Sequence, residues 1–93
     1  MKILCICKGG NVRSVALAQL LKNRGYDALA VGAQDNSQET LKMLEKWADK
    51  IVDVRDYLPE DIWRNPRHPD LVKKVYKIYK RLKKEWKSVE KPL

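Results

Sequence analysis

Short apolar runs alternate with amphipathic segments through residues 1–54, and this alternation restricts the fold more than any other feature. The runs Met1–Cys7, Asp27–Gly32 and Ile51–Val54 have the length and composition of buried strands. Between them, residues 13–24 and 36–48 repeat apolar side chains at helical spacing. Alternating strands and helices predict a parallel sheet with right-handed crossovers. We therefore expect an α/β protein, a small three-layer αβα domain with a short parallel sheet of three to four strands.

Local signals indicate where these elements end. Gly25 stands where a helix would finish in a left-handed residue, and Asn36 with Glu39 resembles a capping box at the start of the second helix. Residues 55–69 are rich in proline and charge, which predicts an irregular connection. Loops of this kind often carry functional residues, so this connection is a candidate part of an active site.

The last part of the chain, residues 71–93, has the pattern of one long amphipathic helix, with apolar residues at spacings of three and four. It holds nine Lys or Arg and two Glu, a balance of +7, whereas residues 1–70 contribute +1 of the net charge of +8. Its basic face fits a nucleic acid, an anionic lipid surface or an acidic protein, and it equally fits a docking helix whose lysines maintain solubility. We expect Asp70, directly after Pro69, to cap this helix.

Length and composition restrict the class of protein. A chain of 93 residues makes one domain, spanning 1–93. No apolar stretch approaches the roughly 20 residues of a membrane span, and the opening residues lack the apolar core of a secretory signal. Two cysteines so close together in one strand cannot form a disulfide framework. We therefore expect a cytoplasmic protein.

Cys7 and Arg13 are separated by five residues in the segment CKGGNVRS, which joins the first strand to the first helix. Glycines in such a turn let several N–H groups point at one spot, and the helix adds the positive end of its dipole. The turn thus suits a dianion. It also suits a thiolate, because the pKa of a cysteine at a helix N-terminus can fall from about 8.5 to between roughly 3.5 and 7.5. An ordinary turn with a buried structural cysteine is the alternative. The predicted phosphate-binding residues are Lys8, Gly9, Gly10, Asn11, Val12, Arg13 and Ser14.

Two side chains give this turn its specific chemistry. The guanidinium of Arg13 is a planar fork that can bind two oxygens of a phosphoryl group, which a lysine cannot do. The hydroxyl of Ser14 can donate a hydrogen bond to the sulfur of Cys7. Together with the turn, these groups predict a cysteine nucleophile facing a bound phosphoryl group.

This loop resembles the phosphate-binding loop of the low-molecular-weight protein tyrosine phosphatases, which place C-x5-R-S after the first strand of a small α/β domain. Residues 44–51, LEKWADKI, resemble the L-x-x-W-A-D-x-I segment of small predicted phosphatases of this kind, and residues 61–69, DIWRNPRHP, resemble their D-x-W-x-N-P-x-H-P segment. The resemblance covers residues 1 to about 72. The chain departs from the common C-x-G-N-x-x-R-S form, because Gly10 takes the asparagine position and Asn11 follows it. The usual Asp-Pro pair carrying the general acid is absent as well.

The resemblance implies a cysteine phosphatase that uses neither metal nor cofactor. Cys7 would attack phosphorus, Arg13 and the loop amides would hold the equatorial oxygens, and a phosphocysteine would form and be hydrolysed. The implied substrate is a phosphorylated protein or a small aryl phosphate. Relatives carry a fourth strand after a longer insertion, but the segment between Val54 and Asp61 is too short for it. Two alternatives stand beside this hypothesis: an arsenate reductase using external thiols, and a non-catalytic module that holds phosphate while the basic helix binds RNA or DNA.

Four downstream aspartates are candidates for the general acid that would protonate the leaving group. Asp53 follows the apolar residues of the third strand. Asp56 comes shortly after it and can reach the carboxyl end of the strand, where ligands of parallel sheets gather. Asp61 lies in the segment that resembles the family, two residues before Trp63. We rank Asp61 first and Asp56 second, and we assign Asp70 to the helix cap. The alternative for each is a solvated loop carboxylate.

The remaining candidates are aromatic residues, a histidine and a second thiol. Tyr57 and Trp63 can wall a slot for a phenyl ring, although packing of the loop against the core accounts for them equally well. His68 has no metal ligand at suitable spacing, so we expect a surface or loop-stabilising role. Cys5 faces the same side as Cys7, and we expect a buried structural thiol rather than a redox partner.

Overall fold

Three parallel strands form one sheet in the order β2-β1-β3. They are β1 (Lys2–Cys7), β2 (Asp27–Gly32) and β3 (Lys50–Asp53). β1 is central, with Cys5 opposite Ala30 on one side and Val52 on the other. The predicted parallel sheet is therefore confirmed, with three strands, and β3 begins and ends one residue earlier than its predicted range.

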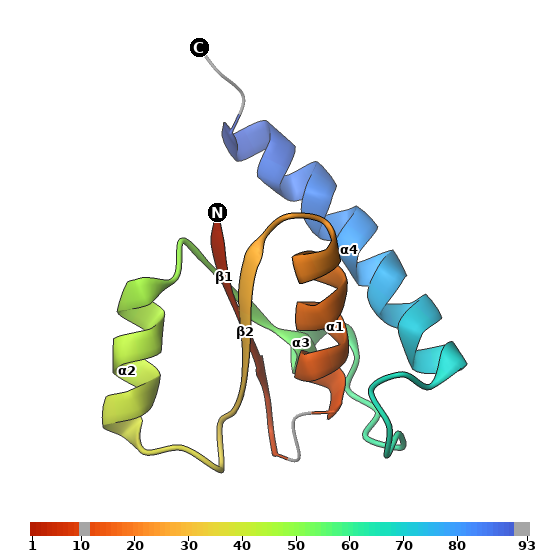
Figure 1. Ribbon diagram of the computed structural model, residues 1–93, viewed down its shortest axis with the longest axis horizontal. Coiled ribbons are helices and arrows are strands. Elements are labelled where there is room, and N and C mark those ends of the chain that lie inside the picture. The colour runs from red at the N-terminus through yellow and green to blue at the C-terminus, as the bar shows by residue number, and fades with distance from the viewer. Residues whose placement is uncertain (10–11, 91–93) are drawn as a thin grey trace.

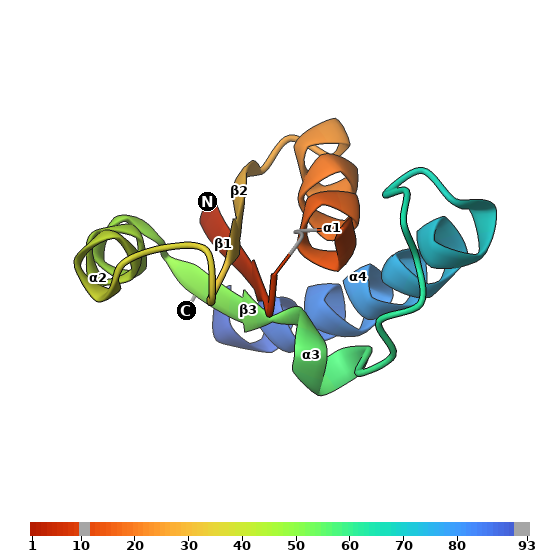
Figure 2. The same ribbon diagram turned by 90° about the horizontal axis from the view of Figure 1, so that it is seen from below.

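Helices cover both faces of the sheet in this computed structural model, which describes residues 1–9 and 12–90, with side chains of the last helix described up to Trp86. The helices α1 (Val12–Asn23) and α4 (Pro69–Glu90) lie on one face, and α2 (Gln38–Trp47) lies on the other (Figures 1 and 2). The α/β class, the layers and the long C-terminal helix are as predicted. Within the described part of the chain, none of the helices has the length and apolar character needed to cross a bilayer.

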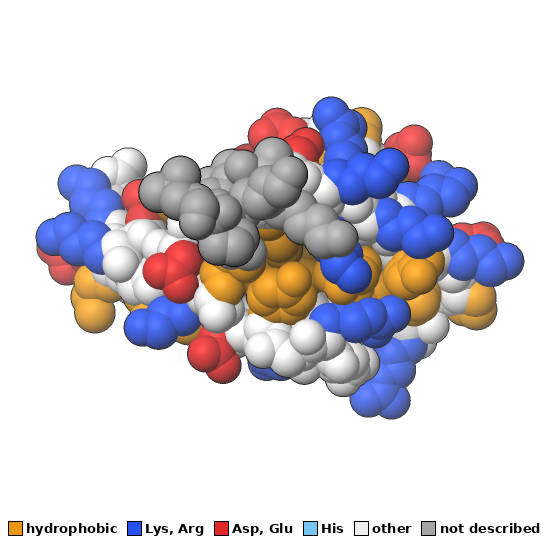
Figure 3. Space-filling model, turned by 90° about the horizontal axis from the view of Figure 1, so that it is seen from above, with side chains coloured by type: hydrophobic (Ala, Val, Ile, Leu, Met, Phe, Trp, Pro, Cys, Tyr) orange, Lys and Arg blue, Asp and Glu red, His pale blue; other side chains and the backbone are white. Residues whose placement is uncertain are grey.

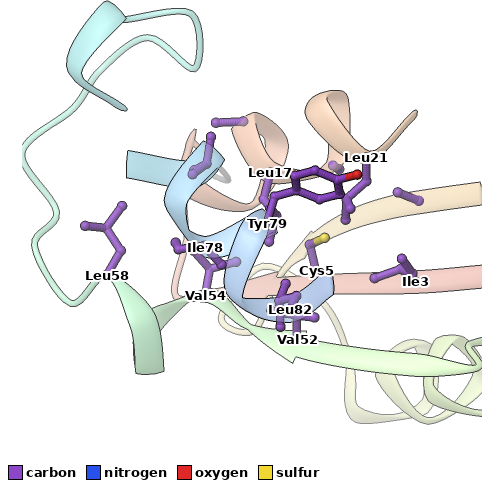
Figure 4. Close-up of a cluster of buried hydrophobic side chains, with 14 of the residues drawn as sticks. Ile3, Cys5, Leu17, Leu21, Val52, Val54, Leu58, Ile78, Tyr79 and Leu82 are labelled. Carbon is purple, nitrogen blue, oxygen red and sulfur yellow. The ribbon is translucent and has the colours of Figure 1, made fainter. Parts of the chain in front are cut away.

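The hydrophobic core lies between the sheet and the pair α1 and α4. Side chains alternate along a strand, so Ile3 and Cys5 of β1 and Val52 of β3 point to this same face. Figure 4 shows them meeting the apolar stripes of the two helices. The labelled residues of α1 and α4 are Leu17, Leu21, Ile78, Tyr79 and Leu82. The long C-terminal helix thus completes the core, which is the docking role the sequence allowed for it.

The opposite face of the sheet is less completely covered. α2 is amphipathic, but none of its residues is fully buried. The strand residues beneath and beside it include Leu29, 39% exposed, and Ile51, 50% exposed. The predicted apolar stripe of α2 is therefore only half-buried. A single helix covers this face, whereas two helices, α1 and α4, cover the opposite face.

Helix α1 ends in a glycine turn. Gly25 has φ of +91°, its N–H donates to the Lys22 carbonyl at 3.0 Å, and the N–H of Tyr26 donates to the Leu21 carbonyl at 3.1 Å. This pair of bonds is the Schellman arrangement, in which the left-handed residue is usually glycine. The C-terminal signal predicted for Gly25 is confirmed.

Replacing Gly25 by alanine is expected to lower the free energy of unfolding by about 1 kcal/mol, because an L side chain is strained at this φ. A Cβ there would meet no atom within 4 Å, so the cost is purely conformational. Urea unfolding followed by circular dichroism measures it. Gly25→Asn should lose less, since asparagine tolerates the left-handed region better. An alanine variant as stable as the parent would contradict this reason.

Two predictions about helix starts are wrong, and so is one about the connection between β3 and the last helix. α2 is capped by Ser37, whose Oγ accepts from the Thr40 N–H at 3.1 Å, because the Asn36 amide instead donates to the Gly32 carbonyl at 2.9 Å. α4 begins at Pro69, and Asp70 lies inside it. The connection expected to be irregular also contains a short helix, α3 (Val54–Tyr57), for which the Asp53 carboxylate accepts the Arg55 N–H at 3.1 Å.

Candidate active site

The carboxyl ends of the three strands meet at one edge of the sheet, the lower edge in Figure 1. β1 ends there at Cys7, opposite Gly32 of β2, and β3 ends at Asp53, opposite Ile6 of β1. The chain leaves β1 through α1 on one face and reaches β3 through α2 on the other. This is the topological switch point, where open α/β sheets bind their ligands. The loop that carries the cysteine motif therefore lies at the favoured position of the fold.

The turn after β2 supports the first half of the loop. The Ala33 N–H donates to the Cys7 carbonyl at 2.7 Å, and the Gln34 N–H donates to the Lys8 carbonyl at 2.8 Å. A Cβ on Gly9 would lie 3.7 Å from Asp35 Oδ2, so this carboxylate is a close neighbour of the loop. Sequence reasoning missed this turn, although its place directly after a strand was a usable signal. Gly10 and Asn11, both predicted to bind phosphate, lie outside the described residues.

Cys7 and Ser14 face each other at the ends of the loop. Their Sγ and Oγ atoms are 3.0 Å apart, and either atom can be the donor. Both residues are 0% exposed. Cys7 Sγ also lies 3.9 Å from the carbonyl oxygen of Gly9. The contact predicted between Ser14 and the sulfur is therefore present, and a thiolate at this position would accept the hydroxyl proton as a charge-assisted hydrogen bond.

Arg13 is buried, with 3% of its surface exposed. It lies in the first turn of α1, and its Nη1 donates to the carbonyl oxygen of Leu58 at 2.7 Å. Its Nε is 4.0 Å from Oδ1 of Asp61. Both partners lie in the segment that follows α3, so contacts from outside α1 orient the guanidinium. The sequence motif gave no sign of Leu58, because a backbone carbonyl so far along the chain carries no local signal.

The candidate acids are placed differently from one another. Asp61 stands beside Arg13, with its side chain 63% exposed, so a substrate leaving group and water can both reach it. Asp56 is an exposed residue of α3, and Asp53 holds Arg55 through two side-chain bonds of 2.7 and 2.8 Å. Of the carboxylates considered, Asp61 is the one whose contact with the motif arginine is observed.

Arg55 is a cation that sequence reasoning did not single out. Its pKa is raised mainly by the hydrogen bond and charge of Asp53, and also by the charges of Asp56 and Cys7. In turn, hydrogen bonds from the Arg55 side chain hold the pKa of Asp53 below its ordinary value.

The Asp53 and Arg55 pair gives the protein an acid-dependent element of stability. The folded pKa of Asp53 is depressed, so its contribution is present above the unfolded value of about 3.9 and is lost as pH falls through the folded pKa. Asp53→Asn keeps a capping oxygen and should cost about 1 kcal/mol or less at pH 7. As the pH falls through the depressed folded pKa of Asp53, the stability of the variant should converge on that of the parent. Urea midpoints across a series of falling pH values measure this, with Arg55→Gln as the matched partner variant. A deficit that persists in acid would contradict the assignment.

The two cysteines have different surroundings. Cys5 is 0% exposed and lies among the core side chains drawn in Figure 4. Burial first, and the charge of Cys7 second, raise the pKa of Cys5 to about 12. Cys5 is therefore the buried structural thiol that was expected.

The two aromatic candidates separate in the structure. Trp63 is 6% exposed and belongs to the hydrophobic core, so the packing alternative applies to it. Tyr57 is half-buried, and the guanidinium of Arg81 lies over its ring, 5.2 Å from the centroid. Tyr57 therefore faces α4.

His68 stabilises the start of α4. Its Nδ1 accepts the N–H of Asp70 at 3.2 Å, and its carbonyl accepts the N–H of Val72 at 2.9 Å. The histidine thus takes the capping place predicted for Asp70, in keeping with the loop-stabilising role expected for it. Among the residues that the structure describes, no group of three or more His, Cys, Asp or Glu is arranged to hold a metal ion.

Comparison with known proteins adds no relative. No protein-family model, curated protein or solved structure matches this chain.

Proposed function

We propose that this protein is a metal-independent cysteine phosphatase that hydrolyses phosphotyrosine-like phosphomonoesters through a phosphocysteine intermediate. The observation that carries the proposal is that Cys7 and Arg13 are both buried and both held by hydrogen bonds at one strand-to-helix turn. Cys7 Sγ lies 3.0 Å from Ser14 Oγ, and Arg13 is anchored on the Leu58 carbonyl at 2.7 Å. The resemblance of this loop to that of the low-molecular-weight protein tyrosine phosphatases supports the same chemistry.

The first step forms the covalent intermediate. The thiolate of Cys7 attacks phosphorus, the S–P bond forms, and the P–O bond to the leaving group breaks with its electron pair on oxygen. Asp61 gives its proton to that oxygen, so the product leaves as a neutral phenol or alcohol. Arg13 and the loop amides bind the equatorial oxygens, where positive groups stabilise the transition state.

The second step releases phosphate. Asp61, now ionised, takes a proton from water as the water oxygen attacks phosphorus. The S–P bond breaks, its electron pair returns to Cys7, and inorganic phosphate leaves. Ser14 assists by donating its hydroxyl hydrogen to the departing sulfur, which stabilises the thiolate as a leaving group.

The direct test is hydrolysis of a chromogenic aryl phosphate by the wild-type protein in the presence of a metal chelator. Acid quenching during turnover, followed by peptide mass analysis, should find one phosphoryl group on the peptide that contains Cys7. Tight phosphate or vanadate binding without hydrolysis would favour the binding-module alternative instead. Arsenate reduction driven by added thiols, with no phosphatase activity, would favour the reductase.

The proposed location is the cytoplasm. Cys5 and Cys7 are not joined in a disulfide, and a thiolate nucleophile survives in a reducing compartment. The proposed substrates are phosphorylated proteins, as the resemblance to the tyrosine phosphatases implies. Small aryl phosphates serve as probes of the same chemistry.

A further inference from the structure

A basic cleft lies between α3 and α4, next to the candidate active site. Its volume is about 270 Å³. The floor is apolar, since Leu58 and Ile78 are both buried, and three cations stand around it. The full lining consists of Tyr57, Leu58, Lys74, Lys77, Ile78 and Arg81.

The cations share one stripe of α4. Lys74, Lys77 and Arg81 are spaced by three and four residues, so they are neighbours on the helix surface that faces α3. Arg81 is held in place by the Tyr57 ring and by Glu85, 3.5 Å from its Nε. Lys74 and Lys77 are exposed. In the wider view of Figure 3, Lys and Arg side chains also gather over the part of the molecule where α4 runs.

One residue joins the cleft to the phosphate loop. The carbonyl of Leu58 accepts a hydrogen bond from the guanidinium of Arg13, and Leu58 also lines the cleft. Asp61 follows on the same segment and lies beside Arg13. A substrate chain whose phosphoryl group sits against Arg13 therefore has the three cations of α4 beside it.

We propose that this cleft binds acidic side chains that flank the phosphorylated residue of a protein substrate. The inference rests on the proposed phosphatase function and adds its substrate class. Carboxylates complement three clustered cations over an apolar floor, which accommodates their methylene groups. The attraction also raises the encounter rate of acidic substrates and weakens as salt is added.

The test compares two phosphotyrosine peptides, one with glutamate and one with glutamine on both sides of the phosphotyrosine. The wild-type protein should prefer the glutamate peptide in kcat/KM. Lys74→Gln with Lys77→Gln should reduce that preference by about 3- to 10-fold, the range for two exposed ion pairs. The rate with a chromogenic aryl phosphate, which has no flanking charge, should stay unchanged.

The matched control is Lys80→Gln with Lys83→Gln. This pair removes the same charge from the same helix, and neither residue lines the cleft. At about 100° per residue Lys83 lies opposite Lys74, while Lys80 is about 60° from Lys77 and outside the lining. The control pair should leave the peptide preference intact. Equal losses from both pairs, or no preference in the wild type, would overturn the proposal while aryl phosphate hydrolysis still stands.

A different result would assign the cleft to nucleic acid. In that case the protein would bind an RNA oligonucleotide, Lys74→Gln with Lys77→Gln would abolish that binding, and the peptide preference would be unchanged. Absence of aryl phosphate hydrolysis would instead refute the phosphatase function, and the cleft proposal with it.

Discussion

Replacing Cys7 by serine is expected to reduce aryl phosphate hydrolysis to background, a loss of about 10⁴-fold or more, as when other covalent nucleophiles are removed. Serine has nearly the same shape, but its hydroxyl stays protonated at neutral pH and is a poor nucleophile. The variant should keep the fold and still bind phosphate or vanadate, because Arg13 and the loop amides are unchanged. Initial rates and vanadate binding measure the two properties separately. Activity that survives the substitution would refute a phosphocysteine mechanism.

Cys5 provides the matched control for this experiment. It lies two residues earlier in the same strand, on the same side, but within the core. Cys5→Ala should lower stability, since a buried side chain is shortened, while each folded molecule keeps its activity. A comparable loss from both variants would mean that the thiols act through packing rather than through chemistry.

Replacing Asp61 by asparagine is expected to lower kcat by roughly 10²–10⁴-fold for a poor leaving group such as phenol, the range typical of lost proton transfer. Asparagine fills the same space beside Arg13 but cannot supply a proton. The loss should shrink for nitrophenol, which leaves readily without protonation. A series of aryl phosphates with leaving groups of different acidity measures this, because the variant should depend more steeply on leaving-group pKa than the parent.

Asp56 is the control for the acid. It is exposed on α3 and carries the same charge close to the same edge of the sheet. Asp56→Asn should leave the leaving-group dependence unchanged. If this variant alone shows the steeper dependence, Asp56 is the acid and the ranking of the two carboxylates is wrong.

The elements predicted well were those whose signals are local. β1, the loop and α1 follow one another as a buried apolar run, a glycine turn and a helical repeat, so the position of Cys7 at a strand end and the Ser14 contact could both be predicted. The role of Gly25 could be predicted equally well, because the left-handed conformation at the end of the helix selects glycine. Errors arose where neighbouring residues compete for one role, as Asn36 and Ser37 do at the start of α2, or His68 and Asp70 at the start of α4.

The features that could not be predicted depend on contacts between distant segments. Arg13 and Leu58 meet only because α3 returns the chain to the end of β1, and no spacing in the motif encodes that return. The turn at residues 33–35 reaches the loop through the pairing of β1 with β2. Trp63 also required the structure, since an aromatic residue in a charged loop can pack inward or face a ligand, and only the fold decides between them.

The hydrogen bond between Arg13 and the Leu58 carbonyl implies that the loop of residues 7–14 does not hold its geometry by itself. A peptide ending before residue 58 would contain all of CKGGNVRS and the helix that follows it. Its Arg13 would nevertheless lack the Leu58 carbonyl that orients the guanidinium. The candidate site therefore needs both the eight-residue motif and the segment around residue 58 in the middle of the chain. If the loop is transferred to another α/β protein, that protein must have a backbone carbonyl where Leu58 supplies one here, to accept the hydrogen bond from the arginine.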